Sequence, residues 1–346
     1  MSNVRPLNSP PRLLQTPHPN AMTNRVSSEE HATAESFLAA LDLQSWTAEG
    51  VWTCPWVFRG QRDALWELTP SAWRTQAATI PLQRLARVRD EVAERHAPAI
   101  IEQLHRNPLT RGANTGYVVK AYAQARAEFS LLLDFVTLAD ELGHRVPNLD
   151  AYLRLAGHTY LPDVQSYPLV RFLPELNPAA ALAQHHGVPT RSLDWTRNPF
   201  YAAYFAGSEV ESQSADGRIA VWAVRPDLLL EQGRAERYNA EYTRFLHHTV
   251  PNSENPYLRS QEGLFIHPTY GCAHIARTGE FPSLEAFAMQ VQSESSSAVI
   301  RTLALPYSEV GELLRLLWLK GVSRAHLMPT IDNVTHALSS RWKWAS

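Results

Sequence analysis

The hydrophobic pattern changes its period along this chain, and that change constrains the fold more than any other feature. In the first half, apolar residues recur at helical spacing over 82–104 and again over 117–142. In the second half, short apolar runs over 218–224, 264–266 and 299–305 are typical of strands. Helices followed by strands predict an α+β fold, with a helical N-terminal half packed on a mixed or antiparallel sheet.

Sequence signals also divide the chain into an arm and one domain. Residues 1–27 contain few large apolar groups, so we expect a disordered N-terminal arm. Residues 28–346 are expected to form a single domain, with a helical insertion at about 80–175. Near its end, an amphipathic helix over 308–320 should stop at Gly321.

The composition limits the kinds of protein that this chain can be. Of its 346 residues, 45% are hydrophobic and 19% are charged, which is typical of a globular protein. The formal net charge of -2 gives no global attraction to nucleic acid or to an anionic membrane. Two distant cysteines, Cys54 and Cys272, do not predict a disulfide framework. Without a membrane-spanning run or an apolar secretory leader, we expect a cytoplasmic protein.

The first polar motif follows an apolar run over residues 52–58, which predicts a short strand ended by Arg59 and Gly60. A rigid strand would hold the planar guanidinium of Arg59 in place, and that group is suited to phosphate or carboxylate. Glycine at position 60 would let a ligand approach the backbone. The alternative is an ordinary strand end with a solvated arginine and a turn glycine.

The second polar motif spans residues 183–199 and leads into an alanine-rich helix. Thr190, Asp194 and Thr196 alternate roughly with period two, so they could share one face of a short strand. Alternatively, these side chains cap the following helix and brace Arg191. We expect Arg191 to pair with Asp194 or with backbone carbonyls, which would fix the loop.

The third polar motif places Gln261 and Glu262 just before a predicted strand. A carboxylate at the start of a strand can project into a cleft and act on a ribose hydroxyl or on a proton. The alternative is an exposed glutamate beside a turn glycine. Although more than 200 positions separate them, we expect Arg59, Asp194 and Gln261 to converge in one cleft.

Two pairs of adjacent histidines invite a metal hypothesis, which the geometry of the chain disfavours. The side chains of His185 and His186, or of His247 and His248, point apart on a helix or a strand, and neither pair has a known ligand spacing. We therefore predict no metal site. A histidine that contacts a ligand, such as His186, and a hydrogen-bonded core histidine both remain open. The chain also lacks the motifs of P-loop, Rossmann, α/β-hydrolase and zincin enzymes.

Taken together, these motifs resemble the FRG domain, which is named for its Phe/Tyr-Arg-Gly sequence. The resemblance runs from about residue 45 to 340, and the middle motif is long enough to make chance improbable. The matching stretches are Phe58-Arg-Gly-Gln61, Leu68-x-Pro-Ser71, Gln184-His-x-Gly-x-Pro-Thr-Arg191, Leu193-Asp-Trp-Thr196, Asn198-Pro199, Phe205-Ala206 and Gln261-x-Gly-x-Phe265.

The order of these motifs is similar to that of mono-ADP-ribosyltransferases of the Arg–Ser–Glu type. That similarity implies an ADP-ribosyltransferase-like fold and NAD as the cofactor. Arg59 and Gly60 would hold the NAD phosphates, and the nicotinamide pocket would be braced by Thr190, Arg191, Asp194, Trp195 and Thr196. Glu262 or Gln261 would hold the nicotinamide ribose and, with Arg59, supply the chemistry. This chain departs from the pattern, because Leu-Asp-Trp-Thr replaces the Ser-Thr-Ser element.

The leading function hypothesis is a nucleotide-dependent transferase or glycohydrolase, linked to NAD, that acts as an intracellular toxin or anti-phage effector on a protein or nucleic-acid acceptor. A second hypothesis is a binding module that senses a nucleotide without turning it over. If Glu262 faces away from Arg59, this second hypothesis becomes the better one. A third is an RNA-directed nuclease, which would need clustered carboxylates or a histidine pair near a basic groove.

Overall fold

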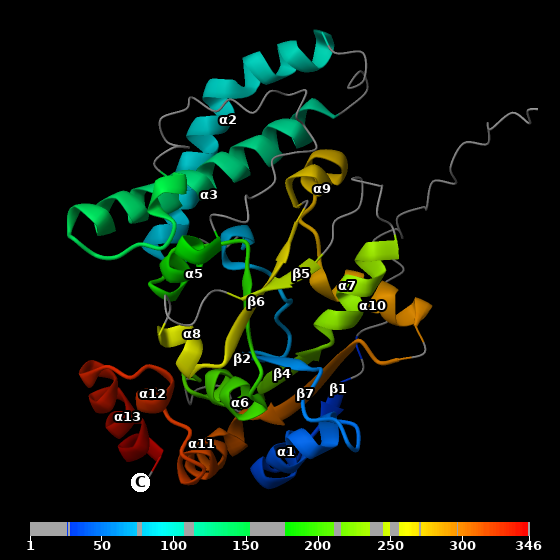
Figure 1. Ribbon diagram of the computed structural model, residues 1–346, viewed down its shortest axis with the longest axis vertical. Helices are drawn as coiled ribbons and strands as arrows, with labels where there is room; N and C mark the ends of the chain where they lie inside the picture. Colours follow the sequence, from blue (N-terminus) through cyan, green and yellow to red (C-terminus); the bar gives the residue numbers. More distant parts are fainter. Residues whose placement is uncertain are drawn as a thin grey trace, which may run out of the picture.

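The strands of the computed structural model form one sheet in the centre of the molecule (Figure 1). The structure describes residues 26, 28–74, 78–106, 114–152, 177–210, 216–235, 245–249, 256–269, 271–295 and 297–344. In this part of the chain the strands are β1 (Ser28–Glu30), β2 (Val57–Gln61), β3 (Leu193–Thr196), β4 (Arg218–Val224), β5 (Phe245–His248), β6 (Gly263–Pro268) and β7 (Ile300–Pro306). Their order across the seven-stranded sheet is β1-β7-β4-β2-β3-β6-β5.

The sheet is mixed, as the sequence predicted. Only the β1–β7 pair is parallel among the described strands, and the other neighbours are antiparallel. β2 lies near the middle, where Arg59 pairs with Trp222 of β4 and Phe58 with Thr196 of β3. Neighbouring strands therefore hold the backbone of β2 from both sides. Arg59 and Gly60 therefore lie inside the strand, and the prediction that they end it is wrong.

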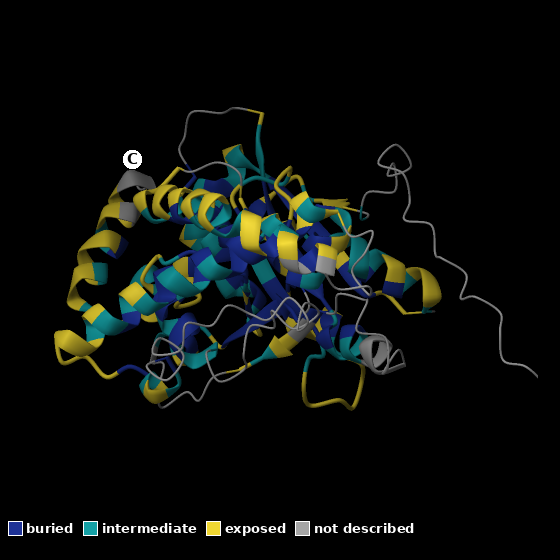
Figure 2. Cartoon of the chain, turned by 90° about the horizontal axis from the view of Figure 1, so that it is seen from above, coloured by how far each residue is buried: buried dark blue, intermediate teal, exposed yellow. Residues whose placement is uncertain are grey.

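Helices cover both faces of the sheet, and β4 shows why its sequence is apolar throughout. Its residues Ile219, Val221 and Ala223 pack with α1, α6 and α11, whereas Ala220, Trp222 and Val224 pack with α7 and α10. Successive side chains of a strand point to opposite faces, so a strand covered on both sides needs apolar residues at every position. Buried residues accordingly gather in the interior, beneath exposed outer helix faces (Figure 2).

A long helical hairpin, α2 with α3, projects beyond the sheet (Figure 1). It packs against α9, which carries the buried Cys272 and Ile275. The described α-helices are α1 (Ala34–Ala40), α2 (Ile80–Arg106), α3 (Thr115–Glu141), α5 (Asn177–His185), α6 (Pro199–Gly207), α7 (Pro226–Ala235), α8 (Pro256–Ser260), α9 (Gly271–Thr278), α10 (Leu284–Glu294), α11 (Val310–Leu319), α12 (Arg324–Leu327) and α13 (Ile331–Trp344). Short 3-10 helices are η2 (Leu43–Trp46), η3 (Ser71–Trp73) and η7 (Tyr307–Glu309).

The α+β prediction is confirmed, but its division into halves is too simple. β1 and β2 belong to the first half, and the helices from α5 to α13 belong to the second, because both faces of the sheet need cover. α2 and α3 lie within the predicted insertion at 80–175, whose part at 153–175 lies outside the described residues. The predicted arm lies outside them too, apart from Val26. None of the described helices is long and apolar enough to cross a membrane.

Candidate functional site

Arg59 reaches from β2 to the neighbouring strand β3. Its Nη1 atom donates a 2.8 Å hydrogen bond to the backbone carbonyl of Asp194 and lies 3.4 Å from the Asp194 carboxylate. Its Nε atom is buried and has no hydrogen-bond partner among the described residues. A buried N–H group without an acceptor is costly, so the guanidinium is only partly satisfied by the protein.

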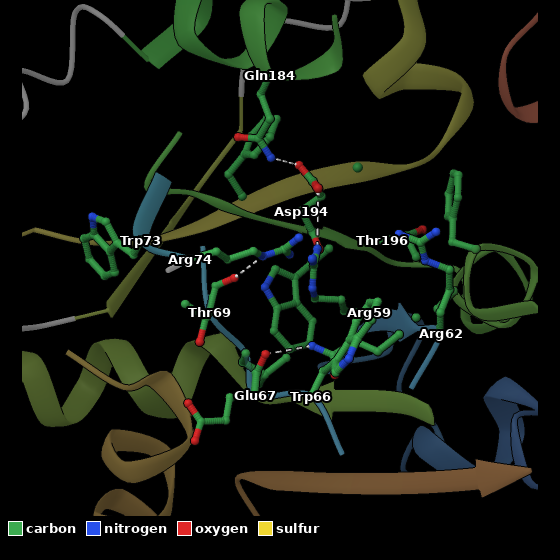
Figure 3. A pocket seen from close by; sticks show the side chains of 18 of the residues that line it. Arg59, Arg62, Trp66, Glu67, Thr69, Trp73, Arg74, Gln184, Asp194 and Thr196 are labelled. Carbon is green, nitrogen blue, oxygen red and sulfur yellow. Dashed lines mark hydrogen bonds and ion pairs between the residues drawn. The ribbon is translucent and has the colours of Figure 1, made fainter. Parts of the chain in front are cut away.

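Arg59 lines a cavity of about 1120 Å³. Two further arginines, Arg62 and Arg74, line the same space, and the indole of Trp66 stands beside them (Figure 3). Arg62 lies over the Trp66 ring at 5.5 Å and also pairs with Glu209 at 2.9 Å. The three guanidiniums share the cavity lining with four carboxylates, those of Glu67, Asp194, Glu280 and Glu285.

Arg74 is the least compensated of these arginines. Its Nε atom donates to the backbone carbonyl of Thr69 at 3.3 Å, and it forms no ion pair within the described part of the chain. Loss of hydration in the cavity lowers the pKa of Arg74, and the like charges of Arg59 and Arg62 lower it further. Asp194 opposes this shift. An anion bound between the arginines would remove the repulsion.

Asp194 ends a chain of hydrogen bonds that begins at Thr190. The Thr190 hydroxyl donates to the side-chain oxygen of Gln184. The Gln184 amide in turn donates to the Asp194 carboxylate (Figure 3). Asp194 and Gln184 both line the cavity, and the side chain of Asp194 is 58% exposed. Thr190 is buried and braces η3 through Ser71. The period-two pattern therefore places Asp194 at the cavity but leaves Thr190 outside β3.

Arg191 does not pair with Asp194, which was one of its two predicted kinds of partner. It is buried with Glu128 of α3, and the Arg191 Nε to Glu128 Oε2 distance is 2.6 Å. The same carboxylate accepts from Trp73 at 3.0 Å and from Gln124 at 2.8 Å. Arg191 points away from Asp194 because a fully buried guanidinium requires an equally buried partner. Among the described residues that line the cavity, Arg191 is absent.

Gln261 and Glu262 separate in space. Gln261 lines the cavity together with Arg59 and Asp194, so the predicted convergence of these three residues is confirmed. Glu262 is exposed, adopts the left-handed φ of 48°, and lies 3.5 Å from the Asn198 amide. It is not among the described residues that line the cavity. The backbone turn that starts β6 thus directs the two adjacent side chains to different places.

Thr196, Trp195 and Gly60 also line the cavity, yet each has a structural reason for its identity. The Thr196 hydroxyl donates to the Gln261 carbonyl at 2.7 Å, which ties β3 to the turn before β6. The Trp195 ring is only 2% exposed. A Cβ atom at position 60 would lie 2.0 Å from the Ala202 carbonyl oxygen, so glycine is needed there to let α6 approach β2.

Of the adjacent histidines, it is His185 and not His186 that lines the cavity. The His185 ring stacks on Tyr257 with 4.0 Å between centroids. Burial, with the like charge of His186, lowers its pKa to about 4, so the ring is neutral at pH 7. His186 is exposed and stacks near Phe135 at 6.2 Å. In the described part of the chain, no group of three or more His, Cys, Asp or Glu residues could hold a metal ion.

The sequence motifs did not reveal the arginine cluster at the cavity or the buried Glu128 carboxylate that binds Arg191. Arg62, Trp66 and Arg74 belong to the loop that follows the Phe-Arg-Gly strand, and a signal was present in the arginines and tryptophans around Leu68-Thr-Pro-Ser. Glu128 carried a weaker signal, because it interrupts an otherwise apolar stripe of α3 at four residues from Gln124.

Comparison with known proteins gives one result for this chain. The model of the FRG domain family matches residues 152–215, a range that contains Gln184, Thr190, Arg191 and Asp194. No curated protein and no solved structure matches the chain. The matched range includes β3 and α6, which bring Asp194 to the cavity and hold the Phe-Arg-Gly strand in place. The chain is therefore an FRG-domain protein.

Proposed function

We propose that the cavity binds a phosphate-bearing dinucleotide of the NAD type. The observation that carries this proposal is the Nε atom of Arg59, which is buried without a hydrogen-bond partner among the described residues, beside Arg62 and Arg74. Guanidinium groups match phosphate oxygens in charge and in planar geometry. Burial lowers the pKa of Arg74, and the like charges of Arg59 and Arg62 lower it further, so a diphosphate bound beside the three arginines would reduce the repulsion between them.

The size and lining of the cavity support a ligand larger than phosphate alone. Its volume of about 1120 Å³ lies slightly above the usual range for ligand pockets, which extends to about 1,000 Å³. Trp66 is 45% exposed and offers a ring face for a nucleobase. Gln184, Asp194 and His185 add hydrogen-bonding groups, with His185 neutral at pH 7. Such groups fix the orientation of a nucleotide, whereas the arginines supply affinity.

Binding without turnover is the form of this proposal that the positions of the residues favour. Glu262, which the transferase analogy assigns to chemistry, does not line the cavity within the described residues. A transferase or glycohydrolase would have to use Asp194 or Gln261 instead. An enzymatic form of the proposal rests on the order of the motifs alone. It would include an ADP-ribosyltransferase-like fold, a protein or nucleic-acid acceptor, and a role as a toxin or anti-phage effector.

The experiment that tests the proposal is a calorimetric titration of the full chain with NAD, combined with an assay for nicotinamide release. We expect NAD to bind, and Arg74→Gln to weaken binding by roughly 10- to 100-fold, as expected for a charge-assisted contact. Arg87→Gln is the matched control, because Arg87 lies on the exposed face of α2 and its only described partner is Glu91. It should bind NAD like the parent.

The two readouts separate binding from catalysis. NAD binding without nicotinamide release identifies a sensing module, and release that is lost in Asp194→Asn identifies a glycohydrolase. Release that is lost in Glu262→Gln, with binding kept, would return the chemistry to Glu262. Failure of millimolar NAD to bind the folded parent protein contradicts the proposal.

A further inference from the structure

The carboxylate of Asp194 is only partly satisfied by the protein. It lines the cavity beside three arginines, yet it does not neutralise them completely, since its Oδ2 atom stays 3.4 Å from Arg59 Nη1. Its Oδ1 atom accepts from Gln184, and its side chain is 58% exposed. A carboxylate oxygen has two lone pairs, so Asp194 keeps acceptor capacity for a ligand that brings hydroxyl donors.

A negative charge next to a phosphate-binding cluster needs a reason, because it opposes the binding of an anion. A like charge at contact distance weakens the binding of an anion, and it does so more strongly where less water surrounds the two charges. Ribose hydroxyls supply that reason, since they lie close to the phosphates of a nucleotide and donate to carboxylates. Gln184 holds the Asp194 carboxylate in place, and Thr190 in turn holds Gln184.

We infer that Asp194 accepts a hydrogen bond from the adenosine ribose of the bound nucleotide. It thereby selects a ligand whose 2′-hydroxyl on that ribose is free. The hydroxyl would donate to Asp194, whereas a 2′-phosphate would place charge against the carboxylate. The cavity therefore takes NAD in preference to its 2′-phosphorylated form, NADP. This inference rests on the proposed function, because it requires a nucleotide in the cavity. It names Asp194 as a specificity-determining residue and assigns it no part in bond cleavage.

The other acidic residues of the cavity are less suited to this role. Glu285 accepts a hydrogen bond from the Leu68 backbone N–H at 2.8 Å, and burial raises its pKa. Glu67 and Glu280 also line the cavity, but the described contacts with Arg59 are those of Asp194 alone. Asp194 is thus the carboxylate that contacts Arg59, whose Nε atom has no hydrogen-bond partner among the described residues.

The test compares three ligands by calorimetry: NAD, NADP and inorganic pyrophosphate. The parent protein should bind NAD at least about tenfold more tightly than NADP, which corresponds to about 1.4 kcal/mol. Asp194→Asn should reduce this ratio to about threefold or less. The same variant should bind pyrophosphate at least as tightly as the parent does, because it removes a negative charge beside the arginines. If the role of Asp194 were only structural, Asp194→Asn would weaken the binding of all three ligands together.

Asp194→Glu is the matched variant, since it keeps the charge and should keep the preference for NAD. The melting temperature of each variant confirms that it is folded. Equal affinity of the parent for NAD and NADP overturns the inference, and so does a preference that survives in Asp194→Asn. Failure of the parent to bind either dinucleotide overturns the proposed function as well. Binding of pyrophosphate but no dinucleotide identifies an anion site without a ribose-reading residue, which also contradicts the inference.

Discussion

Arg191→Met should destabilise this protein more than the loss of any exposed arginine. The Arg191 and Glu128 side chains are 3% and 2% exposed, and their closest atoms lie 2.6 Å apart. Methionine fills much of the same volume but leaves the Glu128 carboxylate buried without its cation. Removing one partner of a buried ion pair typically costs about 3–5 kcal/mol, because the remaining charge loses its compensation. We expect that loss in the free energy of unfolding.

The surroundings of Glu128 set the lower bound of that estimate. Trp73 and Gln124 still donate to the carboxylate in the variant, so part of its hydrogen bonding remains. Glu128→Gln should cost a comparable amount, since it leaves the Arg191 guanidinium buried with a neutral partner. The double variant removes both charges together. Its cost should be smaller than the sum of the two single costs by at least about 1 kcal/mol.

Urea denaturation at pH 7, followed by fluorescence, measures these differences. Thermal melting should show a drop of roughly 6–10 °C for Arg191→Met, if each kcal/mol shifts a large domain by about 2 °C. Arg87→Met is the control, because Arg87 pairs with Glu91 on the exposed surface of α2 at 2.8 Å. Such surface pairs contribute about 0.5 kcal/mol. Two results would contradict the role of the buried pair in holding the loop that contains Arg191. One is that Arg191→Met costs no more than Arg87→Met, and the other is that the costs of Arg191→Met and Glu128→Gln simply add in the double variant.

Three further perturbations test other parts of the fold and the cavity. Gly60→Ala should destabilise the protein by about 3 kcal/mol in urea denaturation, because its Cβ would lie 2.0 Å from the Ala202 carbonyl oxygen and force β2 and α6 apart. Arg74→Gln should leave the melting temperature unchanged or raise it slightly, since it relieves repulsion from Arg59; a clear decrease would make Arg74 a structural residue. His248, whose pKa burial lowers from 6.5 to about 4, should make stability fall as the pH drops from 6.5 to 4, because the unfolded chain takes up the proton first. His248→Gln should therefore reduce the loss of unfolding free energy between pH 7 and pH 4.5, and an unchanged loss would contradict this assignment.

The sequence predicted those helices and strands whose signals lie within the element itself. The apolar run at 218–224 became β4 without a shift of either end, and Gly321 ends α11 with a φ of 79°. Both signals are local, since they depend on a continuous apolar run and on a left-handed stop. β1 and β5 were missed because they contain three and four residues, and only pairing with β7 and β6 stabilises them.

The candidate site was predicted less completely, because its contacts join residues that lie far apart in the sequence. Motif reasoning brought Arg59, Asp194 and Gln261 to one cavity, because each motif stands at or next to a strand of the same sheet. It could not find the partner of Arg191, since Glu128 lies 63 positions away on a helix that belongs to none of the three motifs. Gly60 was assigned to ligand approach although its contact is with α6, and sequence alone does not show which face of a glycine is covered.

The stretch that identifies the family cannot form the cavity by itself. Residues 152–215 contribute β3, but β3 lies between β2 and β6, and both of those strands are outside that range. Arg59 and Arg74 precede the range, and Gln261 follows it. Within the range, Arg191 joins the loop to α3, whereas Asp194 turns toward the arginines. The motif therefore combines a buried anchor and a ligand-facing carboxylate three residues apart. Changes at the first should alter stability, and changes at the second should alter ligand preference, so the two measurements must be made on each variant before a role is assigned.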